Sequence, residues 1–219
     1  IQAAKVGSEI FKQRPVTEYQ PGHQALYHPP RTPHGLYIED ILPRWASIAQ
    51  TTQQIAASDD FPVFLTGDHS SAGAIIAGLK MAHPDKTLGV VWIDAHLDLH
   101  TPYTSPSGNV HGMPLGASLG LTSTELNLHE ISQDTADNWK AMVKLGDIRP
   151  KIKPEDLVFH GIRSYEAPEW ELVQELGIHY FTVDDFRKEG VGSMAKQTLE
   201  RLDNCDMIYV SFDVDSLDA

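Results

Sequence analysis

Three short motifs in the sequence hold the side chains that metal ions prefer as ligands. They are GDHS at positions 67–70, DAHLD at 94–98 and SFDVD at 211–215. Side chains two residues apart on an extended chain point to the same side. Asp94, His96 and Asp98 therefore face one way in the second motif, and Asp213 and Asp215 do the same in the third. Together with His69, the motifs supply four carboxylates and two imidazoles.

This set of side chains predicts a site for two divalent cations. Carboxylates that are packed together repel one another, and their pKa values rise. Two divalent cations would cancel the four negative charges. Oxygen and imidazole donors without a thiolate suit Mn²⁺, and they also bind Fe²⁺, Co²⁺, Ni²⁺ or Zn²⁺. Two such ions about 3.5–4 Å apart can share a water, lower its pKa and present hydroxide to an electrophile.

The elements that must position these motifs alternate along the chain. Short apolar runs typical of buried strands are separated by longer segments with helical spacing. This pattern predicts βαβ units and one α/β domain over 1–219, with a parallel sheet covered on both faces. The expected strands are 62–65, 88–93, 157–162, 178–183 and 207–212, and the expected helices are 36–57, 70–81, 112–120, 132–145, 166–176 and 191–202.

Each ligand motif follows one of the predicted strands. Ligands of open parallel sheets bind beyond the carboxyl ends of the strands, so chemistry is expected there. Taken alone, each motif has a simpler explanation: Asp68 fits a helix cap, and a single D-x-H or D-x-D pattern is typical of a loop. Their coincidence at three strand ends of one sheet favours a metal site.

Composition and charge limit the classes of partner. Lys and Arg total 17 against 30 Asp and Glu, which gives a net charge of −13. Nucleic acids and anionic membranes are therefore poor partners, whereas cations such as metal ions or a guanidinium are attracted. The alternative is that the acidic surface only confers solubility. The sequence shows no secretion signal and no apolar run near the roughly 18 residues of a membrane helix. The single cysteine, Cys205, fits a reducing compartment, so we expect a cytoplasmic protein.

The two ends of the sequence lead to separate expectations. Residues 1–36 are rich in Pro, Gly and His, and we expect a loop-rich arm there. The sequence stops at Ala219, soon after the apolar run 207–212. A buried parallel strand normally leads into a loop and a covering helix. We therefore expect the C-terminal part of the domain to be missing from this sequence.

These motifs, together with SGNVHGMP at 107–114, resemble the ureohydrolase family and, within it, the arginases. The resemblance runs in order from about Phe61 to the end of the chain. It implies a three-layer α/β/α fold with a mainly parallel sheet, two Mn²⁺ ions per subunit, and a homotrimer or homohexamer. By similarity, one manganese would bind His69, Asp94, Asp98 and Asp213, and the other would bind His96, Asp94, Asp213 and Asp215, with Asp94 and Asp213 bridging.

The resemblance also implies a reaction. A bridging hydroxide would attack the guanidinium carbon of L-arginine and release urea and L-ornithine. Asp98 would orient the hydroxide, and His111 would carry protons to the leaving amine, a task for which histidine is suited near neutral pH.

The resemblance further implies a substrate subsite that binds the α-carboxylate and the α-ammonium of an amino acid. Ser107 and Asn109 offer neutral donors to an α-carboxylate, and both match arginase positions. Glu166 matches a position that faces the α-ammonium, and Glu169 matches a nearby acidic position that binds substrate. His100 stands where arginases carry an asparagine that contacts the carboxylate.

Other functions remain open from the sequence. His100, and Ser164 in place of an acidic residue, would also suit a different guanidino acid. Agmatinases and formiminoglutamases are the nearest alternatives, and the SGN-x-H loop argues against them. A non-catalytic member that binds metal or a partner is an alternative of another class, although every expected ligand and His111 are present. A single-metal site such as that of zinc-dependent deacetylases fits less well, because His69 and the second aspartate pair provide for two metals.

Overall fold

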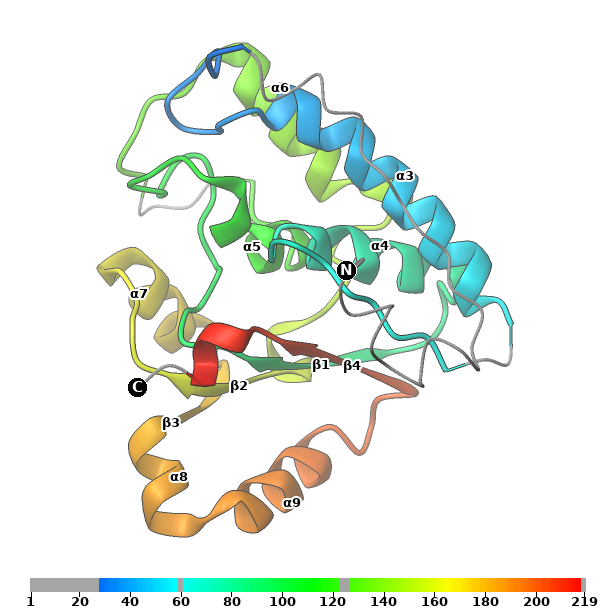
Figure 1. The fold of residues 1–219 in the computed structure, drawn as a ribbon, viewed down its shortest axis with the longest axis vertical. Helices are drawn as coiled ribbons and strands as arrows, with labels where there is room; N and C mark the ends of the chain where they lie inside the picture. Colours follow the sequence, from blue (N-terminus) through cyan, green and yellow to red (C-terminus); the bar gives the residue numbers. More distant parts are fainter. Residues whose placement is uncertain (1–27, 59–60, 123–126, 218–219) are drawn as a thin grey trace, which may run out of the picture.

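The structure is a computed structural model that describes residues 28–58, 61–122 and 127–217. Within these residues four strands form one sheet (Figure 1). β1 (Leu88–Ile93) lies between β2 (Leu157–Ile162) and β4 (Met207–Phe212), and β3 (His179–Thr182) pairs with the other edge of β2. All three pairings are parallel, as predicted. The carboxyl ends of β1 and β4 are consequently neighbours.

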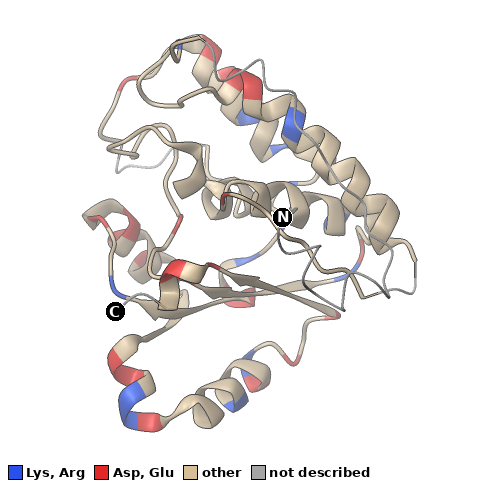
Figure 2. Ribbon diagram, in the orientation of Figure 1, with Lys and Arg blue, Asp and Glu red and all other residues tan. Residues whose placement is uncertain are grey.

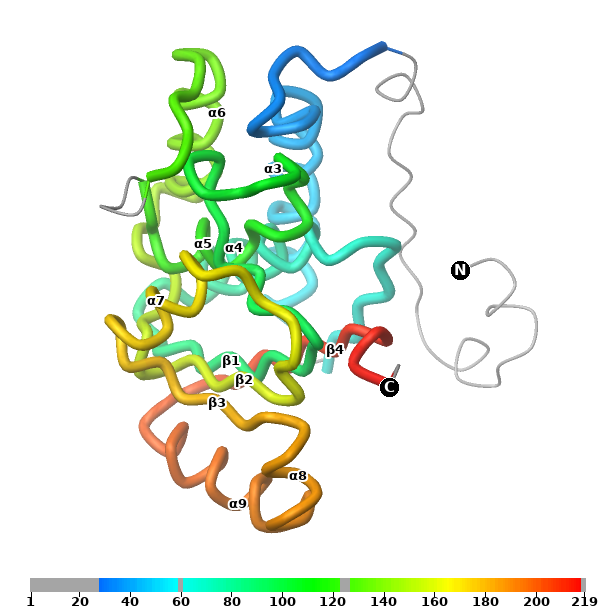
Figure 3. Tube along the Cα trace, turned by 90° about the vertical axis from the view of Figure 1, so that its left-hand side faces the viewer, coloured from blue at the N-terminus to red at the C-terminus, as the bar shows by residue number. Residues whose placement is uncertain are grey.

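Helices cover both faces of the sheet, which confirms the three-layer α/β/α architecture (Figures 1 and 3). On one face lie α4 (Ser71–Ala82), α5 (Pro114–Ser118) and α7 (Ala167–Leu176), and on the other α8 (Val183–Glu189) and α9 (Val191–Arg201). α3 (Ile38–Ala56) and α6 (Gln133–Val143) form an outer tier over α4 and α5. No helix among the described residues is both long and apolar enough to cross a membrane.

The alternation of side chains along each strand gives the two faces of the sheet separate cores. Trp92 and Phe159 are fully buried on the face covered by α4 and α7. Val158 and Phe181 point the other way and pack against Met194 of α9. All residues of β2 are buried, as expected for a parallel strand with both faces covered. These cores fix the strands whose ends carry the ligand motifs.

α4 is held close to α3, which fixes the start of α4 next to the first ligand motif. A Cβ atom on Gly78 would lie 2.5 Å from the backbone oxygen of Ala49, and one on Gly73 would lie 2.3 Å from the ring of Trp45. Only glycine allows so close an approach of the two helices at these positions. His69 precedes α4 by two residues, so this packing also positions the His69 backbone.

The predicted strand at 62–65 is wrong. These residues have no strand, and Phe61, Val63 and Leu65 are 88%, 74% and 49% exposed. A strand requires a neighbour to pair with its N–H and C=O groups, and the described part of the chain offers this run none. His69 is therefore presented by a loop rather than by the end of a strand.

A second difference is the short helix α8, which the sequence pattern did not predict. The strand expected at 178–183 ends at Thr182, whose side chain accepts a hydrogen bond from the amide of Asp185 and caps α8. The other predicted helices form with small changes at their ends. The described end of the expected arm, residues 28–36, contains turns and no helix, and residues 1–27 lie outside the described residues.

Candidate metal centre

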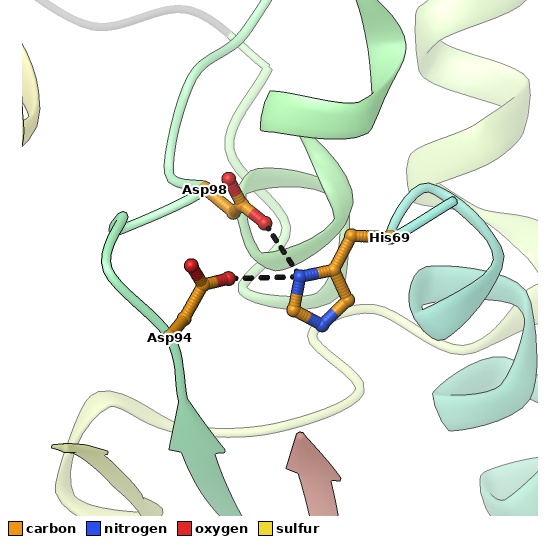
Figure 4. A group of neighbouring side chains, drawn as sticks. All are labelled: His69, Asp94 and Asp98. Carbon is orange, nitrogen blue, oxygen red and sulfur yellow. Dashed lines mark ion pairs between the residues drawn. The ribbon is translucent and has the colours of Figure 1, made fainter. Parts of the chain in front are cut away.

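The imidazole of His69 meets three carboxylates at the carboxyl end of the sheet, and Figure 4 shows two of them, those of Asp94 and Asp98. Its Nδ1 atom lies 2.8 Å from Oδ2 of Asp94 and 3.1 Å from Oδ2 of Asp98. The same nitrogen is 3.3 Å from Oδ2 of Asp213, which follows β4. The structure thus gathers four of the predicted ligands from the loop before α4, the end of β1 and the end of β4.

A second group shares Asp94 with the first. Nδ1 of His96 lies 3.0 Å from Oδ2 of Asp215 and 3.3 Å from Oδ1 of Asp94. Asp94 therefore turns one oxygen toward His69 and the other toward His96, as expected for a bridging ligand. Oδ2 of Asp213 lies near His69, and Oδ1 of Asp213 accepts a hydrogen bond from the amide of Asp215 at 3.0 Å rather than lying beside His96. Bridging by Asp213 stays a prediction.

Two side chains that the sequence analysis missed hold His69 in place. Trp92 stacks on the His69 ring with centroids 4.0 Å apart and planes 10° apart. Oγ of Ser211 lies 2.7 Å from Nε2 of His69. Trp92 also donates from Nε1 to Oδ2 of Asp94 at 3.2 Å. Such outer contacts orient metal ligands. Sequence spacing could have indicated these two residues, because Trp92 and Ser211 each precede a predicted ligand aspartate by two residues and so share its side of the strand.

The backbone around the ligands is held at both strand ends. Asp98 has φ 50°, in the left-handed region that residues other than glycine seldom adopt, and its carbonyl accepts the amide of Leu115 at 3.1 Å. Arg163, in the loop after β2, donates from its guanidinium to the carbonyl oxygens of Asp215 and Ser216. The turn η5 (Val214–Leu217) is thereby tied to the sheet, with Asp215 beside His96.

The electrostatics of the first group favour a positive charge at its centre. Burial alone would lower the pKa of His69, but Asp94 and Asp98 outweigh it and raise that pKa to about 9. Burial raises the pKa of Asp98 to about 6, against the opposing effect of His69. Burial also acts to raise the pKa of Asp94, and contacts with His69 and His96 reverse this and lower it. Figure 2 shows the acidic position of Asp215 on η5 and further acidic positions on α7.

These residues fit a pair of metal ions. Nδ1 of His69 is buried and makes no hydrogen bond of acceptable geometry, although three carboxylate oxygens surround it at short distance. A cation bound to these atoms would satisfy both the nitrogen and the oxygens. The two groups, His69–Asp94–Asp98 and Asp94–His96–Asp215, each bring their donor atoms within 4.8 Å of one another. The imidazole and carboxylate donors are those that Mn²⁺ accepts.

Three of the predicted substrate-binding residues form a second cluster. Nε2 of His100 lies 3.0 Å from Oε2 of Glu166 and 3.3 Å from Oε2 of Glu169. Glu169 also accepts the amides of Leu99 and Glu166, at 3.0 and 3.2 Å. Burial and the nearby Glu166 raise the pKa of Glu169 to about 9. The hydrogen bond with Glu169 lowers the pKa of Glu166, and His100 adds to this effect.

The other predicted residues lie on the loop between β1 and α5. The hydroxyl of Ser107 accepts the amide of Asn109 at 3.2 Å. The carbonyl of Gly112 accepts the amide of His100 at 3.0 Å, which brings the neighbouring His111 back toward the ligand loop. Ser107 and His111 are exposed. No contact described in the structure joins the side chains of Ser107, Asn109 or His111 to the metal-ligand carboxylates.

Comparison with known proteins identifies the family. The model of the Arginase family matches residues 24–219. The chain belongs to the arginase family. The curated arginase of Bacillus subtilis (strain 168) is 38% identical over 181 residues, which are 83% of this chain and 55% of that protein. That of Brevibacillus brevis is 35% identical over 88% of this chain and 59% of its own length. This arginase-family chain thus spans little more than half the length of these relatives.

Solved arginases share the fold. The Bacillus caldovelox arginase superposes with a TM-score of 0.71 at 30% identity, over 92% of this chain and 58% of that one. An Entamoeba histolytica arginase in complex with L-ornithine gives a TM-score of 0.70 at 27% identity, over 92% of this chain and 60% of that one. Both findings agree with the resemblance seen in the sequence motifs.

Proposed function

We propose that the complete protein is a manganese-dependent arginase that hydrolyses the guanidinium group of L-arginine to L-ornithine and urea. The observation that carries this proposal is the pair of ligand groups that share Asp94 where β1 and β4 end. His69, Asp94, Asp98 and Asp213 would hold one manganese, and His96, Asp94, Asp213 and Asp215 the other. When bound, the two ions supply Lewis-acid activation of the water that attacks the guanidinium carbon.

The remaining predicted residues would orient the attacking water, transfer a proton and bind the substrate carboxylate. Asp98, 7% exposed, would accept a hydrogen bond from the attacking water and orient it. His111 would give a proton to the leaving amine of ornithine. Ser107 and Asn109 would donate to the α-carboxylate. The crystallised complex of the Entamoeba histolytica arginase with L-ornithine supports an amino-acid ligand for this family site.

Glu166 would face the α-ammonium, with the buried Glu169 at the nearby acidic position of the same subsite, and His100 belongs to this subsite through its contacts with both. By resemblance to the family the assembly would be a homotrimer or homohexamer, and the single cysteine favours the cytoplasm.

The first test is urea release by the full-length protein after incubation with Mn²⁺. L-arginine is the substrate, and agmatine, which lacks the carboxylate, is the matched control. We expect urea from L-arginine and little from agmatine. Equal rates on the two compounds, or activity on agmatine alone, would contradict the assignment of Ser107 and Asn109 to the carboxylate.

Substitutions separate the proposed roles of the ligands and of His111. His111→Ala should keep the bound manganese and slow turnover by roughly 10²–10⁴-fold, the usual effect of losing a general acid or base. Asp94→Asn should lose manganese and turnover together, because it weakens a ligand that serves both groups. Metal content is measured by elemental analysis beside each rate. Loss of manganese from His111→Ala would show that the histidine is not a proton carrier.

Another ureohydrolase activity is the second candidate. His100 and Ser164 differ from the arginase pattern. This difference favours a guanidino or formimino acid with a different backbone. The same assay with 4-guanidinobutyrate and formiminoglutamate tests it, with formamide release from formiminoglutamate measured as well as urea release from 4-guanidinobutyrate. A protein that holds two metals and turns over none of these compounds would be a non-catalytic member.

A further inference from the structure

His100 is buried between two segments and has no ring nitrogen left for a ligand. Its side chain is 7% exposed. Nδ1 lies 3.2 Å from Oγ1 of Thr104, and Nε2 lies 3.0 Å from Oε2 of Glu166. Thr104 itself accepts the amide of Thr101 at 3.0 Å, so the ring is anchored on its own loop. The imidazole thus spans the gap between the loop after β1 and the start of α7.

Glu166 is the more exposed partner in this contact. Its side chain is 53% exposed, against 4% for Glu169. A glutamate at the surface samples several rotamers, and fixing it in one costs conformational entropy. Nε2 of His100 fixes the Glu166 carboxylate from the buried side and leaves its outer side open. Glu169 supports the same arrangement, because its Oε2 atom accepts the Glu166 amide at 3.2 Å.

We propose that His100 is a positioning residue that holds the Glu166 carboxylate ready for the ammonium group of the substrate, and that it makes no contact with the substrate carboxylate. This inference rests on the proposed function, since it concerns the substrate of the same site. Pre-organising a binding group lowers the free-energy cost of fixing it when the ligand binds. His100 therefore contributes to recognition of the ammonium through Glu166.

Two substitutions at this position separate the ring nitrogens. The amide of asparagine reaches about as far as Nδ1, so His100→Asn keeps the contact with Thr104 and loses that with Glu166. The amide of glutamine reaches about as far as Nε2, so His100→Gln keeps a donor for Glu166. If His100 only stabilises its loop, His100→Asn should behave like the wild type. If His100 positions Glu166, His100→Gln should behave like the wild type and His100→Asn should not.

The test uses three product-like ligands and the full-length, manganese-loaded protein. L-ornithine carries both charges, 1,4-diaminobutane lacks the carboxylate, and 5-aminopentanoate lacks the α-ammonium. Their affinities are measured by titration calorimetry on the wild type, His100→Asn, His100→Gln and Glu166→Gln. We expect His100→Asn to weaken the binding of 1,4-diaminobutane about tenfold, as for loss of a charge-assisted contact, and not to weaken the binding of 5-aminopentanoate. The affinities of His100→Gln for 1,4-diaminobutane and 5-aminopentanoate should stay within about threefold of the wild-type values.

The double variant His100→Asn/Glu166→Gln completes a cycle. If His100 acts through Glu166, His100→Asn has little further effect once Glu166→Gln is present. The inference is overturned if His100→Asn weakens the binding of 5-aminopentanoate instead, because this would show that His100 contacts the substrate carboxylate directly. It is also overturned if the two single effects simply add, or if His100→Asn loses manganese. The proposed function fails separately, when the wild type releases no urea from L-arginine.

Discussion

At the scale of single residues, side-chain type and spacing predicted which acidic and histidine side chains the structure brings together, because the period of an extended chain places Asp94 and Asp98 on one side. The same rule could not name their supports. Ser211 and Trp92 hold His69 through contacts between segments far apart in the sequence, and no local pattern shows which segments will meet. The burial of His100 could not be predicted for the same reason, since its partners Glu166 and Glu169 lie at and just after the start of α7, far along the chain.

The raised pKa of His69 predicts proton release when the metal binds. Near neutral pH the imidazole of the metal-free protein is protonated, since its pKa is about 9, and a metal ligand must be neutral. Binding of Mn²⁺ at pH about 7.5 should therefore release about one proton from His69. Manganese affinity should rise with pH up to about 9 and level off above it, where His69 is already neutral.

The release is measured by titration calorimetry in buffers of different ionisation enthalpy. Below pH about 6 the carboxyl of Asp98 adds a second proton, so the release should grow there. The titration above the pKa of His69 serves as the control, because the release should disappear. Manganese binding without proton release near neutral pH would contradict the assignment of His69 as a ligand.

At the scale of helices and strands, periodicity placed β1, β2 and β4 at their observed ends, because long apolar runs have few alternatives in a parallel sheet. It failed at 62–65, where the run is short and strand formation depends on a partner rather than on composition. It also failed at α8, where the cap between Thr182 and Asp185 decides the change from strand to helix. Local hydrophobicity shows neither whether a strand has a pairing partner nor where a helix cap ends a strand.

The contact between β2 and α9 predicts a loss of stability in acid. Nε2 of His160 lies 2.9 Å from Oγ1 of Thr198, whose hydroxyl donates to the carbonyl of Met194. Nε2 is therefore the donor. Burial, with a contribution from His179, lowers the pKa of His160 to about 4. The unfolded chain binds a proton at higher pH than the folded one, so stability is complete above the ordinary histidine pKa and falls as the pH drops toward 4.

The loss should reach about 3 kcal/mol in the free energy of unfolding, measured by urea denaturation across this range. His160→Gln is the matched variant, because its amide can donate to Thr198 and does not titrate. Its stability should depend less on pH than that of the wild type, with a remainder from His179, whose pKa is also lowered by burial. Identical pH profiles for the two proteins would show that His160 does not control the acid response.

At the scale of the whole molecule, the strand order β3-β2-β1-β4 brings the candidate metal site together. It places β4, the last described strand in the sequence, beside β1, the first. The alternation of elements predicted a parallel sheet but not this order. The register that pairs Ile93 with Phe212 places Asp94 and Asp213 at the same level of the sheet. The motifs themselves predicted a shared metal site, and only the resemblance to the family indicated in advance that Asp94 and Asp213 would bridge the two ions.

This arrangement predicts that manganese stabilises the entire fold. The ligands come from the loop before α4, the end of β1 and the segment after β4, so the site exists only when these parts are assembled. A ligand that binds only the folded state adds about 2.7 kcal/mol at a free concentration 100 times its Kd. The melting temperature of the full-length protein should therefore rise with Mn²⁺ and fall on chelation. Asp94→Asn should remove most of this shift, because Asp94 serves both groups, whereas His111→Ala should keep it. An equal shift in wild type and Asp94→Asn would place the stabilising ion elsewhere in the molecule.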